Sequence, residues 1–229
     1  MRFTVSSTAL SSKLNALSRV INSKNSLPIL ADFLFDIQDN VLRLTASDSE
    51  NVMNTQVELT DCDGNGRFAI GNHDLLEGVK GFSEQPITFD VNLQENIVKI
   101  SYQNGMFSLP IENADEYPQA QLITDGANTI TISSDLLAEN INRSVFATAH
   151  DELRPVMNGI YFDLTPECLA IVASDGHKLV RNKVFSIQTE QPAAFILPKK
   201  PATLLKSLLQ KDGGDVEIRF DERNAQINY

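Results

Sequence analysis

The sequence repeats itself once, and the repeat is as long as a domain. Segment 3–102 aligns without a gap with segment 130–229, the end of the chain. Within this alignment Ala46-Ser47-Asp48 lies on Ala173-Ser174-Asp175. A period of this length is typical of a whole domain rather than of a solenoid unit. The sequence therefore predicts two copies of one fold.

The two copies set the expected domain boundaries. We expect a first domain over residues 1–120 and a second over residues 128–229, with a linker over 119–128. The second copy contains nothing that corresponds to segment 103–118, so we expect the second domain to be incomplete, with its last strand missing. This pattern predicts that the chain is a fragment.

Each copy shows the same order of elements twice. In the first copy, apolar residues at helical spacing predict helices over 7–22 and 72–82, each with a strand before it and three strands after it. The second copy predicts helices near 134–148 and 200–210. Strands with alternating polarity favour antiparallel sheets covered on one face. The expected class is α+β, with two βαβββ units per domain and two helices on one face of the sheets.

Charge is distributed unevenly along the chain. The net charge of −11 argues against a nucleic-acid partner. Segments 1–31 and 191–211, however, contain basic residues and no Asp or Glu, and each includes a predicted helix. The pattern predicts positive charge on the helical layer and acids in strands and loops. Chance clustering of a few solvated lysines explains the same pattern equally well.

The sequence also excludes some classes of protein. Its apolar runs are shorter than the roughly 18–20 residues of a membrane span, and residues 1–10 lack the apolar core of a secretory signal. We therefore expect no membrane partner and a cytoplasmic location. Cys62 and Cys168 do not match in the repeat and belong to no CxxC motif, which predicts reduced, structural thiols.

Two alternative functions have partial support. His150-Asp151 or Asp175-Gly176-His177 could pair a general base with a carboxylate, but no nucleophile, P-loop or HExxH motif accompanies them. Segment 61–66 resembles the start of a calcium loop, but Asn72 stands where the bidentate Glu should be. We expect a turn between strands at this segment, and neither catalysis nor a metal or cofactor.

Several motifs occur in the order and spacing of one known family. They are Met1–Val5, Ser26–Leu30, Thr45–Glu50, Phe107–Pro110, Ala114–Pro118, Met157–Gly159, Ala173–Leu179 and Leu197–Lys200. Through these motifs the whole chain resembles the bacterial sliding clamps, the beta subunits of DNA polymerase III. Each motif alone is weak, but their common order makes the resemblance specific.

The resemblance implies a tandem of sliding-clamp domains in a processivity factor without catalytic activity. Family members form a head-to-tail homodimer ring with three like domains per subunit, helices around the hole and sheets outside, and duplex DNA passes through without sequence specificity. This chain corresponds to the first domain and most of the second, and the third clamp domain is absent. The family's interface joins the first domain to the partner's third, so the resemblance implies no closed ring for this chain alone. The alternative is a protein-interaction scaffold that does not encircle DNA.

The first group of candidate site residues is basic and would attract DNA phosphates. Phosphate contacts carry no sequence information and therefore suit sliding. The family positions are Lys24, His73, Lys199 and Lys200, and the charge pattern adds Lys13, Arg19 and Lys206. The alternative for each is a solvated surface residue.

The second group corresponds to part of a hydrophobic cleft that receives short linear peptides from DNA polymerase subunits, the clamp loader and repair proteins. Its members here are Arg154, Met157, Ser174, Gly176, His177, Lys178 and Leu179. Gly176 permits close backbone approach, and Met157 and Leu179 offer adaptable apolar contact. The first copy has Ser47–Val52 at the matched place without the Gly-His pair, so we expect no peptide binding there. We expect Asp48 and Asp175 to cap a turn at a strand end.

Overall fold

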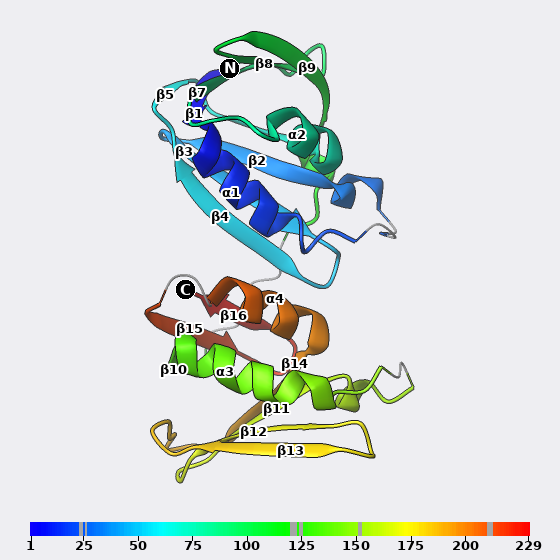
Figure 1. Ribbon diagram of the computed structural model, residues 1–229, viewed down its shortest axis with the longest axis vertical. Coiled ribbons are helices and arrows are strands. Elements are labelled where there is room, and N and C mark those ends of the chain that lie inside the picture. The colour runs from blue at the N-terminus through cyan, green and yellow to red at the C-terminus, as the bar shows by residue number, and fades with distance from the viewer. Residues whose placement is uncertain (23–24, 26, 120–122, 124–125, 151–152, 210–212) are drawn as a thin grey trace. The chain divides into compact units, whose positions relative to one another are not determined.

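The protein consists of two compact units, Met1–Ala120 and Gln121–Tyr229. The computed structural model describes residues 1–229 apart from 23–24, 26, 120–122, 124–125, 151–152 and 210–212. Helices α1 and α2 of the first unit, and α3 and α4 of the second, pack on antiparallel strands (Figure 1). No helix in the described part of the chain is both long and apolar enough to cross a membrane.

The first unit forms a single antiparallel sheet of nine strands in the order β4-β3-β2-β6-β9-β8-β7-β1-β5. Its elements are β1 (Arg2–Ser6), α1 (Ser7–Leu17), the 3-10 helix η1 (Pro28–Ala31), β2 (Asp32–Gln38), β3 (Val41–Ser47), β4 (Val52–Glu58), β5 (Asp61–Asp63), β6 (Gly66–Gly71), α2 (Asn72–Val79), β7 (Pro86–Asn92), β8 (Ile97–Tyr102), β9 (Gly105–Glu112) and η2 (Ala114–Glu116). Strand β9 pairs with both β6 and β8, and so joins strands β4-β3-β2-β6 to strands β8-β7-β1-β5 in one sheet.

The second unit repeats this order up to β16, which corresponds to β8, except that its described residues contain no strand equivalent to β5. Its strands form two sheets, β10-β15-β16 and β13-β12-β11-β14. Its elements are β10 (Asn128–Ser133), α3 (Ser134–Ser144), η3 (Val145–Ala147), η4 (Pro155–Met157), β11 (Gly159–Leu164), β12 (Leu169–Ser174), β13 (Leu179–Val184), β14 (Ala193–Pro198), α4 (Lys199–Leu209), β15 (Asp215–Phe220) and β16 (Ala225–Asn228).

Helix α1 begins where the sequence predicted, but it ends at Leu17 and not at the predicted end, residue 22. The Ser6 side chain accepts a hydrogen bond from the Ala9 N–H at 3.2 Å, which caps the first turn. Leu10, Leu14 and Leu17 are buried on one face. After Leu17 the backbone turns with i→i+3 hydrogen bonds, a tightening common at helix ends.

Other element boundaries also differ from the sequence prediction. Helix α2 ends at Val79 instead of 82, and α3 ends at Ser144, where the short helix η3 replaces the predicted last turn. The predicted loop over 61–66 begins with strand β5, which pairs with β1. A three-residue strand is too short to show a period of two, which is why the pattern missed it.

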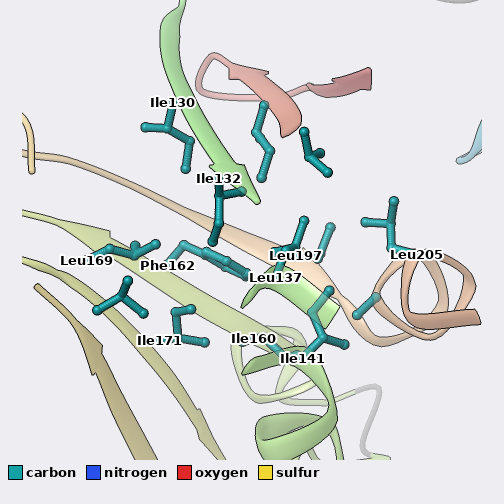
Figure 2. Close-up of a cluster of buried hydrophobic side chains, with 14 of the residues drawn as sticks. Ile130, Ile132, Leu137, Ile141, Ile160, Phe162, Leu169, Ile171, Leu197 and Leu205 are labelled. Carbon is teal, nitrogen blue, oxygen red and sulfur yellow. The ribbon is translucent and has the colours of Figure 1, made fainter. Parts of the chain in front are cut away.

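The cores of the two units contain the same aromatic pair. In the first unit Phe35 of β2 stacks on Phe68 of β6 with ring centroids 5.1 Å apart. In the second, Phe162 of β11 stacks on Phe195 of β14 at 4.8 Å. The two pairs are equivalent in the sequence repeat. Figure 2 shows Phe162 among apolar side chains from α3, α4 and the strands, which join both helices to the sheets.

One carboxyl group is buried at the start of β2. Asp32 is 9% exposed. Burial, and secondly the charge of Glu112 on β9, raise the pKa of Asp32 to about 6. Ionised Asp32 therefore lowers the stability of the first unit, because desolvation and a like charge both disfavour the charged form.

Candidate functional site

Some of the cations predicted to face DNA lie on helices α1 and α4, and others do not. Lys13 lies exposed on α1, whose opposite face is buried. Arg19 lies beyond the end of α1, on the turn that follows, so its predicted helical position is wrong. Lys24 lies outside the described residues. Lys200 and Lys206 lie on α4 and are half-buried.

His73 sits on the first turn of α2 beside an acid. Its Nδ1 lies 3.2 Å from Oδ1 of Asp74, and both side chains are exposed. The neighbouring carboxylate offsets any positive charge on the imidazole. His73 would therefore attract a phosphate less strongly than an exposed lysine without an acidic neighbour.

The helical layer is not uniformly basic, which corrects the prediction from charge. Helices α1 and α4 contain lysines and no acids. Helix α2 contains Asp74 and Glu77, and α3 contains Asp135 and Glu139. Each unit therefore pairs one basic helix with one acidic helix, because segments 1–31 and 191–211 each include only one of the two helices of their copy.

The second unit contains a cavity of about 400 Å³ that gathers part of the predicted peptide site. Its lining residues are Phe146, Thr148, Ala149, His150, Arg154, Asp175, His177, Lys178 and Lys199. Arg154, His177 and Lys178 were predicted for the peptide site, and Lys199 for DNA. The structure thus places one predicted DNA contact in the same cavity as the peptide residues.

The turn after β12 forms one wall of this cavity and is held by two side chains. Asp175 Oδ1 accepts hydrogen bonds from the N–H groups of His177 at 2.9 Å and Lys178 at 2.8 Å. The backbone hydrogen bond from Lys178, followed by that from His177, holds the pKa of Asp175 well below its usual range. Ser174 Oγ donates to the Lys178 carbonyl and accepts from the Gly176 N–H. The predicted turn-capping role of Asp175 is confirmed.

Asp48 makes the equivalent turn in the first unit, as predicted. Its Oδ1 accepts from the N–H groups of Glu50 at 3.1 Å and Asn51 at 2.7 Å. The turn itself is therefore common to both copies. The second copy differs in the side chains that the turn presents to the cavity.

Gly176 is needed at its position because of its backbone conformation. Its φ of +88° belongs to the region that favours glycine, and an added Cβ would lie 3.4 Å from Nη1 of Arg154. The guanidinium of Arg154 therefore packs close to the turn backbone. Any other residue at position 176 would strain the turn, and its Cβ would also crowd the guanidinium of Arg154.

The remaining predicted peptide residues lie around the cavity rather than in its wall. Met157 is half-buried at the end of η4, and its carbonyl accepts a hydrogen bond from the Ala149 N–H at 2.8 Å. Leu179 begins β13 with 69% of its surface exposed. Met157 thus fixes the segment that carries His150, and Leu179 offers apolar surface next to the cavity.

Sequence reasoning assigned neither Phe146 nor His150 to a binding site, although both line the cavity. Phe146 is 59% exposed, and its ring lies 5.8 Å from Nζ of Lys178. His150 Nε2 lies 2.6 Å from Nζ of Lys199. Phe146 lies inside the helix predicted near 134–148, where the pattern gives no sign of its exposure, and 49 residues separate the histidine from the lysine.

Among the described residues, the geometry supplies neither the Asp175–His177 pair nor a calcium site. The carboxylate of Asp175 binds backbone N–H groups and the Lys178 ammonium, not the ring of His177. Asp151, the proposed partner of His150, lies outside the described residues. Asp61 and Asp63 lie in β5, and the described residues contain no group of three or more His, Cys, Asp or Glu suited to a metal ion.

Each unit corresponds to one domain of a known family. Residues 1–121 match the DNA polymerase III beta subunit, N-terminal domain, and residues 131–229 match the central domain of the same subunit. The chain belongs to the DNA polymerase III beta-subunit family. The two copies of the sequence repeat are therefore two successive domains of a beta subunit, which confirms the resemblance seen in the motifs.

Individual relatives show the same fold. The beta sliding clamp of Haemophilus influenzae is 25% identical over 230 residues, which cover 100% of this chain and 62% of that protein. The solved beta subunit of Pseudomonas aeruginosa has a TM-score of 0.92 and 25% identity, with 100% of this chain and 62% of that chain covered. That of Thermotoga maritima has a TM-score of 0.86 and 26% identity, with 100% and 61% covered. The α+β clamp fold is confirmed, and the chain spans 61–62% of the length of these relatives.

Proposed function

We propose that this chain forms part of a DNA sliding clamp, which encircles duplex DNA and keeps the replicative polymerase on its template. The observation that carries the proposal is the duplicated unit, in which two helices pack side by side on one face of the strands. The role requires no bond to be made or broken, so the proposed protein is a non-catalytic processivity factor. Its place of action would be the cytoplasm, where bacterial DNA is replicated.

DNA contact in this proposal is electrostatic and independent of base sequence. Lysines on α1 and α4 would neutralise phosphates, each adding a salt-dependent contribution with a slope near −0.9. The proposed DNA-facing residues are Lys13, Lys200 and Lys206, with Arg19 and Lys24 as flanking cations and His73 as a minor contact. Contacts of this kind hold a duplex without fixing its register, which sliding requires.

Partner proteins would dock through short linear peptides at the cavity of the second unit. Arg154, His177 and Lys178 line it, and exposed Leu179 lies beside it. We propose that these peptides are segments of polymerase subunits, the clamp loader and repair proteins. A closed ring would be a head-to-tail homodimer in which each subunit contributes three clamp domains, of which this chain supplies the first and most of the second.

Retention on closed DNA tests the encircling role. The protein at its natural length is loaded by its clamp loader onto a nicked plasmid, and half of the sample is then cut once. We expect retention on the circle and loss from the linear form, because a topological tether slides off free ends. The alternative is a protein-interaction scaffold, which would show equal retention on both forms and would refute encirclement.

A further inference from the structure

In the first unit, the side chain of Met1 fills a gap at the start of the strands. The Val91 N–H donates to the Met1 carbonyl at 2.8 Å, and the Met1 ammonium donates to the Val91 carbonyl at 3.2 Å. A Cβ added to Gly66 of β6 would lie 3.0 Å from Sδ of Met1 and 3.9 Å from Cδ1 of Leu93. Met1 and Leu93 therefore occupy the space beside the start of β6.

Strand β5 covers the outer edge of β1 next to Met1. Its last residue, Asp63, pairs with Arg2 in antiparallel register. A Cβ added to the following Gly64 would lie 3.9 Å from Cα and from Cβ of Met1. A strand in this place therefore runs along β1 and ends beside the Met1 side chain.

The second unit has a cavity of about 270 Å³ at the corresponding place, which we call the β10 cavity. Asn128, the residue equivalent to Met1 in the sequence repeat, starts β10 and pairs with Phe220. Its side chain is shorter than that of methionine, so it leaves space that Met1 fills in the first unit. The described lining residues are Gly126, Ala127, Asn128, Pro192, Ala193, Ala194, Phe220, Asp221 and Glu222.

The outer edge of β10 is also open. Strand β10 pairs with β15, and among the described residues no second strand pairs with it. The segment equivalent to β5, residues 188–190, forms no strand. The Thr189 N–H donates instead to the Thr165 carbonyl at 3.2 Å, in the turn between β11 and β12. An edge of this kind presents backbone donors and acceptors that an added strand can bind.

The β10 cavity combines apolar walls with negative charge. Alanine, proline and phenylalanine side chains supply the apolar surface, and the charged residues of the described lining are Asp221 and Glu222. Asp221 Oδ1 accepts from the N–H groups of Arg223 and Asn224, which holds the turn after β15. Glu222 is exposed. An apolar side chain with a lysine or arginine beside it would match both properties of this cavity.

We propose that an extended segment of a partner protein adds to β10 as an antiparallel strand, inserts an unbranched apolar side chain such as methionine into the β10 cavity, and places a lysine or arginine beside Glu222. In the first unit β5 and Met1 show that this place accepts both a strand and a methionine. Main-chain hydrogen bonds would supply affinity, and the cavity would supply specificity. The site shares no lining residue with the cavity beside the turn after β12, so it goes beyond the peptide docking proposed above.

A labelled octapeptide tests the site on the purified chain. It carries fluorescein at its N-terminus, alternates Thr and Val over five residues, and ends in Met, Lys and an amidated Ser. We expect saturable binding by fluorescence anisotropy and slower hydrogen exchange in β10. Ser in place of Met should weaken binding at least about tenfold, the factor expected when a methionine side chain stays in water.

Variants of the protein locate the bound peptide. Asn128→Met copies the first unit and should fill the β10 cavity, so the affinity should fall at least about tenfold while the far-UV circular dichroism stays unchanged. Glu222→Gln should weaken binding about two- to fivefold, the range of one exposed ion pair. Glu167→Gln removes an exposed acid in the turn before β12 and should leave the affinity unchanged.

The outcomes separate this site from the proposed function. Absence of peptide binding, or equal affinity in Asn128→Met and the unsubstituted chain, would overturn the site and leave the clamp role intact, because retention on circular DNA tests that role separately. Loss of affinity in His177→Ala with Leu179→Ala would place the peptide in the other cavity and overturn the β10 site. Self-association in sedimentation that Asn128→Met abolishes would assign the edge to a second copy of the chain and contradict the partner assignment.

Discussion

Phe162→Ala should destabilise the second unit and leave the first unit unchanged. Phe162 is 0% exposed, so the substitution leaves a cavity where the ring was and also removes its stacking on Phe195. Truncation of a buried phenylalanine costs about 3–5 kcal/mol, and loss of an aromatic pair accounts for about 0.5–1.5 kcal/mol of that. This is a large part of the roughly 5–15 kcal/mol that stabilises a typical domain.

The matched substitution in the first unit is Phe35→Ala. Phe35 is also 0% exposed and stacks on Phe68, the residue equivalent to Phe195. We expect a loss of similar size, confined to Met1–Ala120. Phe162→Leu serves as the milder control, because it keeps an apolar side chain that fills much of the space of the ring and should therefore cost less than Phe162→Ala.

Hydrogen exchange measured peptide by peptide gives the readout for each unit. The chain has no tryptophan, so mass spectrometry of exchanged fragments together with far-UV circular dichroism in urea is the suitable assay. Phe162→Ala should speed exchange in β11, β12 and β14 while the strands of the first unit keep their protection. Equal loss of protection in both units would refute the reasoning that the repeat forms two separate cores.

Three further predictions concern pH, salt and peptide binding. The folded pKa of Asp32, about 6, exceeds the unfolded value of 3.8, so stability is fully present below the lower value and decreases as pH rises to about 6. Asp32→Asn should remove this decrease in urea unfolding, and an unchanged pH profile would contradict the burial argument. Lys13→Gln should lower the salt slope of duplex binding by about one, while Lys99→Gln on β8 should not, and equal slopes would argue against α1 as a DNA contact. His177→Ala with Leu179→Ala should weaken peptide binding severalfold without loss of retention on circular DNA, and unchanged peptide affinity would refute the peptide site.

The sequence predicted those parts of the fold in which local pattern and tertiary packing agree. The order of elements along the chain and the turns at Asp48 and Asp175 follow from residues close together in the chain, and the repeat follows from comparing its two halves. The end of α1 was wrong because the pattern could not show that the backbone tightens after Leu17. Strand β5 was missed because its pairing with β1 joins residues about 60 positions apart, beyond the reach of a short-range pattern.

The candidate site was predictable only in part. His177 and Lys178 lie in a family motif, Arg154 was added through the family resemblance, and the structure brings all three to one cavity. The position of Lys199 beside His150 depends on how the start of α4 packs against the segment after α3, which no local pattern encodes. Residue type therefore predicted a cation, and only the tertiary structure shows that this cation lies beside His150.

Lysine reactivity measured with and without DNA is the most direct test of DNA contact through the helical layer. The protein is acetylated briefly in the presence and absence of a short duplex at low salt, and each lysine is quantified by mass spectrometry. We expect the duplex to protect Lys13 on α1 and Lys206 on α4, and to leave Lys99 on β8 and Lys183 on β13 fully reactive. Protection of the strand lysines instead of the helix lysines would contradict the account.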